Sequence, residues 1–289
     1  MERKPHFPSR AAPATAGYRP PMRHGITLPP FLDWSDPRVV AALAAEAEAA
    51  GWDGFFLWDH IAWDPAWGGP LPMADPWQCL TAAAIATDRL RLGPMVTPLT
   101  RRRPQQVARQ VVTLDLLSRG RVVLGVGLGA DYEFVAFGEP VRDRGRRLDE
   151  ALTVITGLLA GDAVDFEGDH FTVHCAPMLP TPVQEHLPIW VGGWWPNHAP
   201  FLRAARFDGV VPGKVGQDAL TVDDLGAIRA LVGRGEGYDY VASGTTTGPD
   251  DDTPTAWAAA GATWWLESLH PFGGNAGAAR RRIGAGPPR

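Results

Sequence analysis

The segment Gly51-Trp-Asp-Gly-Phe-Phe-Leu-Trp-Asp-His60 predicts the end of a helix, a tight turn and a short strand. The strand is almost entirely apolar, as strands are when helices cover both faces of a parallel sheet. Two ionisable residues, Asp59 and His60, follow at its carboxyl end. Active sites of (β/α)8 barrels lie at the carboxyl ends of the strands. This is therefore where an active site would lie if the chain forms such a barrel.

Strand-like and helix-like segments alternate eight times along the chain. Asp36 before Pro37 is a strong helix start, because an N-cap side chain precedes a proline at the first helical position. The predicted strands are 24–31, 53–59, 89–99, 121–129, 189–193, 208–212, 238–245 and 262–269. The predicted helices are 37–50, 76–87, 104–117, 144–159, 199–207, 222–232, 254–260 and 275–283.

This alternation predicts an α/β protein of the (β/α)8 TIM-barrel class. We expect one domain over residues 22–289, a mobile N-terminal tail over 1–21, and a short excursion, 163–187, before the fifth strand. The excursion contains a predicted hairpin centred on Glu167-Gly168. An open doubly wound sheet is the alternative, but Thr27-Leu-Pro-Pro30 is not the glycine-rich phosphate loop that usually follows its first strand.

The composition argues against several classes of partner. The net charge is −5, which does not favour nucleic acid, and no apolar run is long enough to span a bilayer. Only two cysteines occur, Cys79 and Cys175, so we expect a cytoplasmic protein. His170 and His174 have metal-ligating side chains, but they lie on the predicted hairpin, and we expect no metal site.

Glycine and tryptophan recur at the predicted strand ends. The glycines allow the main chain to approach a flat or phosphorylated ligand, or simply make tight turns; they are Gly127, Gly129, Gly192 and Gly193. The tryptophans of the rim loops suit an extended cofactor or an apolar substrate; they are Trp58, Trp63, Trp67, Trp194 and Trp195. Core packing explains Trp264 and Trp265 of the eighth strand equally well.

Strand side chains alternate, so only one of Asp59 and His60 can point into the barrel. His60 is the more useful proton donor or acceptor, because the ordinary pKa of imidazole is about 6.5. The alternative is a structural Asp-His pair that fixes the following loop.

Several segments in order resemble the luciferase-like flavin-dependent oxidoreductases, the bacterial luciferase superfamily. The longest is Leu114-Asp-Leu-Leu-Ser-Arg-Gly-Arg-Val-Val-Leu-Gly-Val-Gly-Leu-Gly129. The others are 47–60, 91–97, 103–110, 146–152, 182–184, 188–193 and 204–209. The resemblance covers about residues 22 to 270.

The resemblance implies a barrel that binds reduced FMN, or the deazaflavin coenzyme F420, at its carboxyl end. The implied cofactor contacts are Met95, Val96, Thr97, Gly127, Leu128, Gly129, Gly192 and Gly193, beside the catalytic pair Asp59 and His60. Members often have a non-proline cis peptide in the third strand, here expected at Met95-Val96. In the deazaflavin-dependent sugar-phosphate dehydrogenases of the family, His60 matches the base, Trp63 its neighbour and Lys214 a phosphate-binding lysine. Their glutamate after the fourth-strand glycines is replaced by Ala130.

The leading hypothesis is a two-component monooxygenase that uses reduced FMN and oxygen on a small organic substrate, with a separate flavin reductase as a possible partner. Deazaflavin-dependent hydride transfer is the alternative, and a non-catalytic flavin-binding barrel is a third. Trp63, Lys214 and Glu267 are the candidate substrate contacts. We also expect a homodimer. The segments 61–75 and 163–187, or a partner subunit, would have to enclose the substrate.

Overall fold

The computed structural model describes residues 21–64, 66, 68–216 and 219–288, which form a closed barrel of parallel strands. The strands are β1 (Arg23–Leu28), β2 (Gly54–Leu57), β3 (Arg91–Pro94), β4 (Thr97–Pro98), β5 (Leu124–Gly127), β8 (Ile189–Trp195), β9 (Gly209–Lys214), β10 (Asp239–Gly244) and β11 (Trp264–Ser268). Their order in the sheet is β3-β2-β1-β11-β10-β9-β8-β5-β4. β3 and β4 are two halves of the third barrel strand. Pairing of β4 with β5, and a bridge from Leu92 to Val122, close the barrel.

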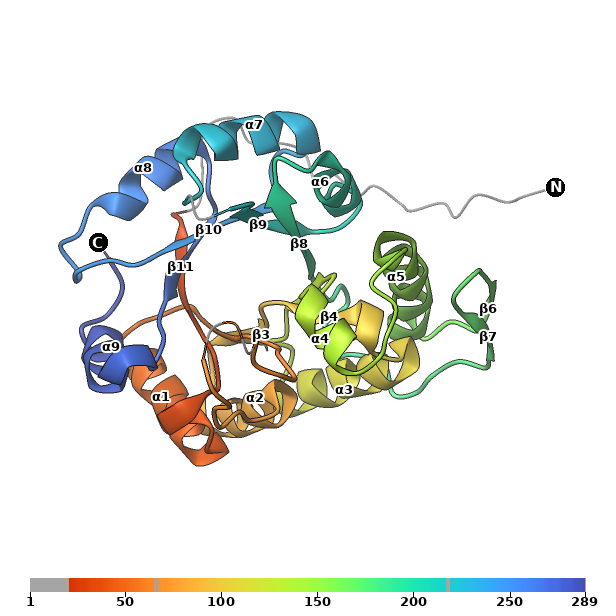
Figure 1. Cartoon of the computed structure of the whole chain (residues 1–289), viewed down its shortest axis with the longest axis horizontal. Coiled ribbons are helices and arrows are strands. Elements are labelled where there is room, and N and C mark those ends of the chain that lie inside the picture. Colours follow the sequence, from red (N-terminus) through yellow and green to blue (C-terminus); the bar gives the residue numbers. More distant parts are fainter. Residues whose placement is uncertain (1–20, 65, 67, 217–218, 289) are drawn as a thin grey trace.

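Helices surround these strands, as Figure 1 shows. They are α1 (Pro37–Ala49), α2 (Pro76–Ala86), α3 (Pro104–Ser118), α5 (Arg144–Ala160), α6 (His198–Ala204), α7 (Val222–Val232), α8 (Thr253–Ala260) and α9 (Ala276–Gly284). The Asp36 carboxylate accepts a hydrogen bond from the backbone N–H of Arg38, and Pro37 begins α1, as predicted. The sequence therefore predicted the fold class correctly, and it placed the helix starts within about a residue.

Large aromatic side chains fill the inside of the barrel. Phe56, Trp190 and Trp264 are buried there, with ring centroids 5.4–5.8 Å apart, together with Val123, Val241 and Leu266. Core packing therefore accounts for Trp264. On β1, a Cβ atom at Gly25 would meet Leu266 and Phe56, so this face of β1 is the inner one. Thr27 lies on the same face, nearer the carboxyl end.

The amino end of the barrel is fixed by a buried polar network. The Asp115 carboxylate accepts hydrogen bonds from the backbone N–H groups of Val122, Val183 and Gln184 and from the Gln184 side chain. Arg121 is also buried, and it donates to the carbonyl groups that end α2, among others. Much of the long segment 114–129 therefore stabilises the face opposite the strand carboxyl ends.

The predicted hairpin of the excursion is confirmed as β6 (Val164–Glu167) paired with β7 (Thr172–Cys175). Figure 1 shows it beyond α5, at the periphery of the molecule. The Glu150 carboxylate of α5 holds it by accepting from the backbone N–H groups of 169–171. The rest of the excursion reaches the amino end of the barrel through Gln184. This excursion therefore does not cover the strand carboxyl ends, contrary to our expectation.

Two further details differ from the predicted elements or refine them. A short helix that the sequence analysis did not predict, α4 (Asp131–Ala136), lies between β5 and α5. The third strand is interrupted at Met95-Val96, where the peptide bond is cis, as the family resemblance predicted.

The predicted tail, 1–21, lies outside the described residues except for Pro21. None of the described helices has the length and apolar character needed to cross a membrane.

Candidate functional site

His60 presents its ring at the carboxyl end of β2. Its side chain is 28% exposed, and its Nδ1 lies 3.0 Å from the Tyr132 hydroxyl and 3.3 Å from Glu133 Oε1. The printed contacts of the ring with described residues are made at Nδ1, and none of the described residues makes a hydrogen bond with Nε2. The structure thus places His60, rather than Asp59, where a ligand at the strand ends could reach it.

Asp59 is enclosed by protein and is only 3% exposed. Thr97 and Arg102 donate hydrogen bonds to its carboxylate, and Arg101 donates to both the carboxylate (2.8 Å) and the Asp59 carbonyl (2.9 Å). Protein groups thus occupy the Asp59 carboxylate, and its predicted catalytic role stays a prediction. Asp59 holds two arginines and the end of the third strand beneath His60.

Glu133 is a residue beside His60 that sequence reasoning missed. It lies on α4, its side chain is buried, and its Oε1 accepts a 2.7 Å hydrogen bond from the backbone N–H of Ile61. Arg101 Nε lies 3.7 Å from Oε2. A glutamate soon after the fourth strand was the available signal, but it lies four residues beyond Gly129 and on no predicted element.

The surroundings of Glu133 favour its charged form. Burial alone would raise the pKa of the carboxyl group, but the hydrogen bond from His60, the charge of Arg101 and the N–H of Ile61 outweigh burial, and the net result is a lowered pKa. Burial and the nearby charges of Glu133 and Asp64 raise the pKa of the Tyr132 hydroxyl. Near neutral pH, His60 therefore lies between a carboxylate and a protonated phenol.

Aromatic rings form one wall beside His60. Phe31 lies 6.1 Å from the His60 ring and 5.8 Å from Trp63, and Trp63 lies 5.3 Å from Phe272, between centroids. Trp58 lies 6.2 Å from His60. The loop that carries Trp63 is tied to the end of β1 by Leu32 N to Pro72 O and Ala74 N to Pro30 O hydrogen bonds. This loop, and not the hairpin, borders the opening; Trp67 lies outside the described residues.

The predicted cofactor-binding residues of the third and fourth strands meet at Val96. A Cβ at Gly127 would lie 2.6 Å from Val96 Cγ2, and a Cβ at Gly192 would lie 3.3 Å from it. Both glycines thus make room for a side chain of the protein. Met95 and Val96 are half-buried, whereas Thr97 is buried, with its hydroxyl donating to Asp59.

Leu128, Gly129 and Gly193 are held by protein contacts. The Leu128 carbonyl accepts from the Thr100 hydroxyl at 2.7 Å, and the Gly129 carbonyl accepts from Arg144 at 3.0 Å. Gly129 has φ +77°, a conformation that favours glycine. A Cβ at Gly193 would lie 2.5 Å from Pro200. Packing is therefore sufficient to explain these glycines, and their predicted contact with a cofactor stays a prediction.

Lys214 ends β9 and is already paired. Its ammonium group lies 2.8 Å from Asp224, at the start of α7. This ion pair lowers the pKa of Asp224 to about 2, with added hydrogen bonds from Thr221. Binding a substrate phosphate would require Lys214 to give up or share that partner.

Glu267 is a structural residue in this fold. It is fully buried, and its carboxylate accepts from the backbone N–H (2.6 Å) and hydroxyl (2.8 Å) of Thr246 and from Trp265 Nε1 (3.2 Å), with Arg282 of α9 3.5 Å away. Both oxygens face the helix layer because Glu267 alternates with the inward-facing Leu266. These contacts account for Glu267 without a ligand, and its predicted contact with substrate stays a prediction.

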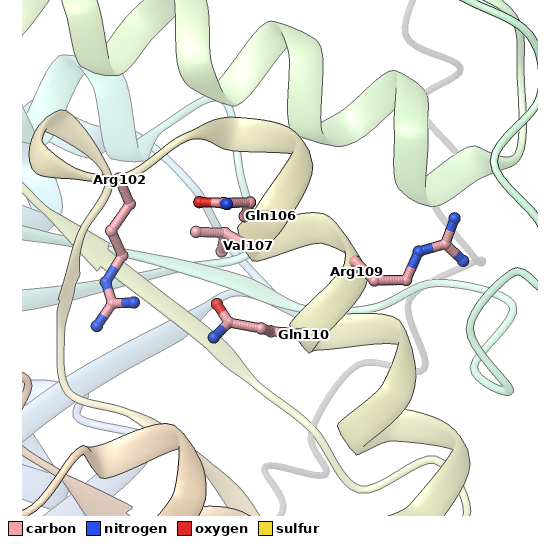
Figure 2. Close-up of a pocket in the computed structure, with 5 residues that line it drawn as sticks. All are labelled: Arg102, Gln106, Val107, Arg109 and Gln110. Atoms are coloured by element: carbon pink, nitrogen blue, oxygen red, sulfur yellow. The ribbon is translucent and has the colours of Figure 1, made fainter.

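A hollow of about 380 Å³ lies on the flank of α3. Figure 2 shows Gln106, Val107 and Gln110 extending from α3 toward Arg102, while Arg109 extends the other way. None of the strand-end residues described above lines this hollow. We therefore place the candidate site at the barrel opening beside His60.

Comparison with known proteins identifies the family of this chain. The model of the family described as luciferase-like monooxygenase matches residues 15–286. The chain belongs to this family. Luciferase-like proteins with the same barrel include a solved F420-dependent secondary alcohol dehydrogenase, with a TM-score of 0.73 at 19% identity over 91% of this chain and 96% of that one. A monooxygenase from Streptomyces bottropensis gives a TM-score of 0.71 at 18% identity over 91% and 97%. At this identity the likeness shows the fold alone.

Curated relatives are similar over part of their length. An F420-dependent glucose-6-phosphate dehydrogenase of Microbacterium testaceum is 38% identical over 154 residues, which are 52% of this chain and 45% of the relative. A protein of the same name from Kineococcus radiotolerans is 32% identical over 221 residues, 75% of this chain and 62% of the relative. The chain thus spans about half the length of the first curated relatives it matches.

Proposed function

We propose that this luciferase-like protein is a deazaflavin-dependent oxidoreductase that oxidises the hydroxyl group of a small, largely apolar substrate. The observation that carries the proposal is the partly exposed His60 ring at the strand ends, beside an aromatic wall, with no described residue bound to its Nε2. The names of the curated relatives, which are F420-dependent dehydrogenases, support the choice of coenzyme.

The residues at the opening fit a flat, polar-edged ring system. Met95 and Val96 offer a half-buried apolar surface, and the Val96 side chain packs against the main chain at Gly127 and Gly192. Thr27, on the inner face of β1, is buried with a hydroxyl that has no hydrogen-bond partner among the described residues. A buried polar group without a partner is costly, and a ligand that reaches into the barrel would supply one.

The deazaflavin coenzyme, when bound, would supply the acceptor for the hydride that leaves the substrate carbon. The protein's part is to take the hydroxyl proton and to orient the carbinol. His60 would accept that proton at Nε2, the ring nitrogen that makes no hydrogen bond with a described residue. The positive charge that His60 gains would be balanced by the Glu133 carboxylate at 3.3 Å.

The residues beside His60 favour an apolar substrate over a sugar phosphate. Phe31, Trp63 and Phe272 line one side, and the Lys214 that would hold a phosphate is paired with Asp224. Ala130 stands where the sugar-phosphate enzymes of the resemblance have a glutamate. We therefore propose an alcohol with a hydrocarbon or aromatic portion.

Oxygenation with reduced FMN is the second candidate function. The same aromatic wall favours it, because apolar side chains would exclude water from the oxygen chemistry that the reduced cofactor would supply. His60 would then donate a hydrogen bond or a proton. A separate reductase would be needed as a partner. A barrel that binds flavin without catalysis remains the third hypothesis.

Turnover assays with the two cofactors separate these functions. With the coenzyme F420 and a panel of alcohols under argon, we expect the coenzyme to be reduced, which is monitored as a loss of its absorbance. We expect the rate of this reduction to be the same in air. Consumption of oxygen with reduced FMN, coupled to substrate oxygenation, would instead establish the monooxygenase. Failure to bind either cofactor would favour the non-catalytic barrel.

A further inference from the structure

His60 has two neutral forms, and the direction in which it can move a proton depends on which form is present. With the proton on Nδ1, Nε2 is a lone-pair acceptor toward the opening; with the proton on Nε2, that atom can only donate. Tyr132 and Glu133, which both contact Nδ1, would have opposite effects on this choice. A phenol can donate to a bare Nδ1, whereas a carboxylate can only accept from Nδ1–H.

The charges around the ring favour the proton on Nδ1. The groups around His60 are Tyr132 and Glu133 on α4, Arg101 beyond Glu133, and the enclosed Asp59, which follows β2. Glu133 is buried and its pKa is lowered, so it is a carboxylate at neutral pH. A bare Nδ1 lone pair 3.3 Å from that carboxylate would be repelled, while an N–H there is attracted.

Glu133 is itself fixed from both sides. The backbone N–H of Ile61, the residue after His60, donates to Oε1 at 2.7 Å, and the Arg101 guanidinium lies beside Oε2. Arg101 is in turn anchored on Asp59 at 2.8 Å. These contacts therefore hold α4 against the end of β2 with the Glu133 carboxylate beside Nδ1.

We propose that Glu133 is a positioning residue that holds neutral His60 as the Nδ1–H tautomer, so that Nε2 is the proton acceptor at the opening. In this arrangement Tyr132 accepts, or shares, the Nδ1–H and is dispensable for the tautomer. The assignment of Nε2 as the catalytic base rests on the proposed function, but the tautomer itself does not.

The direct test is the imidazole nitrogen spectrum of the whole protein labelled with ¹⁵N at histidine, without any cofactor. His60→Gln identifies the His60 signals among those of the eight histidines. The spectra are recorded through a pH series until the signals stop changing, where the ring is neutral. There wild-type His60 is expected to show a protonated Nδ1 and an unprotonated Nε2. A wild-type His60 protonated on Nε2 overturns the proposal.

Three variants test which neighbour sets the tautomer. Tyr132→Phe and Glu133→Gln are expected to keep Nδ1–H, since an acceptor for it remains in each. Glu133→Met removes the acceptor at similar volume, and Tyr132 can then donate to Nδ1, so the signal should move to Nε2–H. The opposite pattern, a switch in Tyr132→Phe and none in a folded Glu133→Met, contradicts the proposal. Should Glu133→Met not fold, the wild-type, Tyr132→Phe and Glu133→Gln spectra still decide.

Activity gives an independent readout of the same assignment. General-base catalysis contributes about 10²- to 10⁴-fold, so Glu133→Met should lower kcat about 100-fold or more, and Glu133→Gln should retain more of it. Cofactor affinity should change little in both. If the protein binds neither cofactor, the proposed function fails while the nitrogen spectrum still reports on Glu133.

Discussion

Substituting Gly127 by alanine tests how the third and fourth strands meet at the candidate cofactor site. The added Cβ would lie 2.6 Å from Val96 Cγ2. Carbon atoms normally approach to 3.5–4.0 Å, so the overlap is about 1 Å. Valine is stiff at χ1, and relief requires the Val96 side chain to move toward the opening. Overpacking of this kind costs about 1–3 kcal/mol of unfolding free energy.

The assay is urea unfolding followed by circular dichroism, with Val96→Ala and the double variant completing a cycle. Val96→Ala removes Cγ2 and with it the clash. The double variant should therefore be more stable than the sum of the single changes predicts, by about 1–3 kcal/mol. Gly226→Ala in α7 is the matched control, because nothing lies within 4 Å of its Cβ; a helix-interior alanine there should stabilise by about 0.5–1 kcal/mol.

The reasoning is refuted if Gly127→Ala is as stable as wild type. It is also refuted if the double variant is no more stable than the sum of the two single changes predicts. Equal destabilisation by Gly226→Ala would likewise show that the loss is not specific to the contact with Val96.

Three further predictions concern the site and the framework. His60→Gln should lower turnover about 100-fold or more while cofactor affinity changes far less; unchanged turnover would remove His60 from the mechanism. Asp115→Ala should cost about 2–6 kcal/mol in urea unfolding, since two or more buried donors lose their acceptor at roughly 1–3 kcal/mol each, whereas the exposed Asp88→Ala should cost under about 1 kcal/mol. The Lys214 pair lowers the pKa of Asp224 to about 2, so its stabilisation is present above about pH 4 and lost as the pH falls through about 2. The difference in Tm between wild type and Asp224→Asn should therefore narrow between pH 6 and pH 2, and a constant difference would contradict this.

The barrel could be predicted because its signals are local. Asp36 with Pro37, and Asp75 with Pro76, start helices through side-chain and backbone geometry that neighbouring residues determine. The run from Gly54 to Leu57 is apolar enough to be recognised as a buried strand without knowing its partners. Eight successive pairs of a predicted strand and a predicted helix are enough to predict the barrel.

The site was predicted less completely because its contacts are between distant residues. α4 has only six residues and no helical period of apolar side chains to reveal it, so Glu133 was not placed beside His60. The orientation of Asp59 depends on Arg101 and Arg102, some forty residues later. Glu267 looks like a strand-end acid in the sequence, and only the packing of α9 shows that Arg282 and Thr246 occupy it.

The most direct test of the central claim is a fluorescence titration of the purified protein with the coenzyme F420. The account predicts saturable binding to the wild-type protein. Gly127→Ala should weaken the affinity at least about tenfold, which corresponds to a loss of about 1.4 kcal/mol of binding free energy. Gly226→Ala should leave the affinity unchanged. Absence of binding, or binding that Gly127→Ala leaves intact, would contradict a cofactor site at the opening beside Val96 and His60.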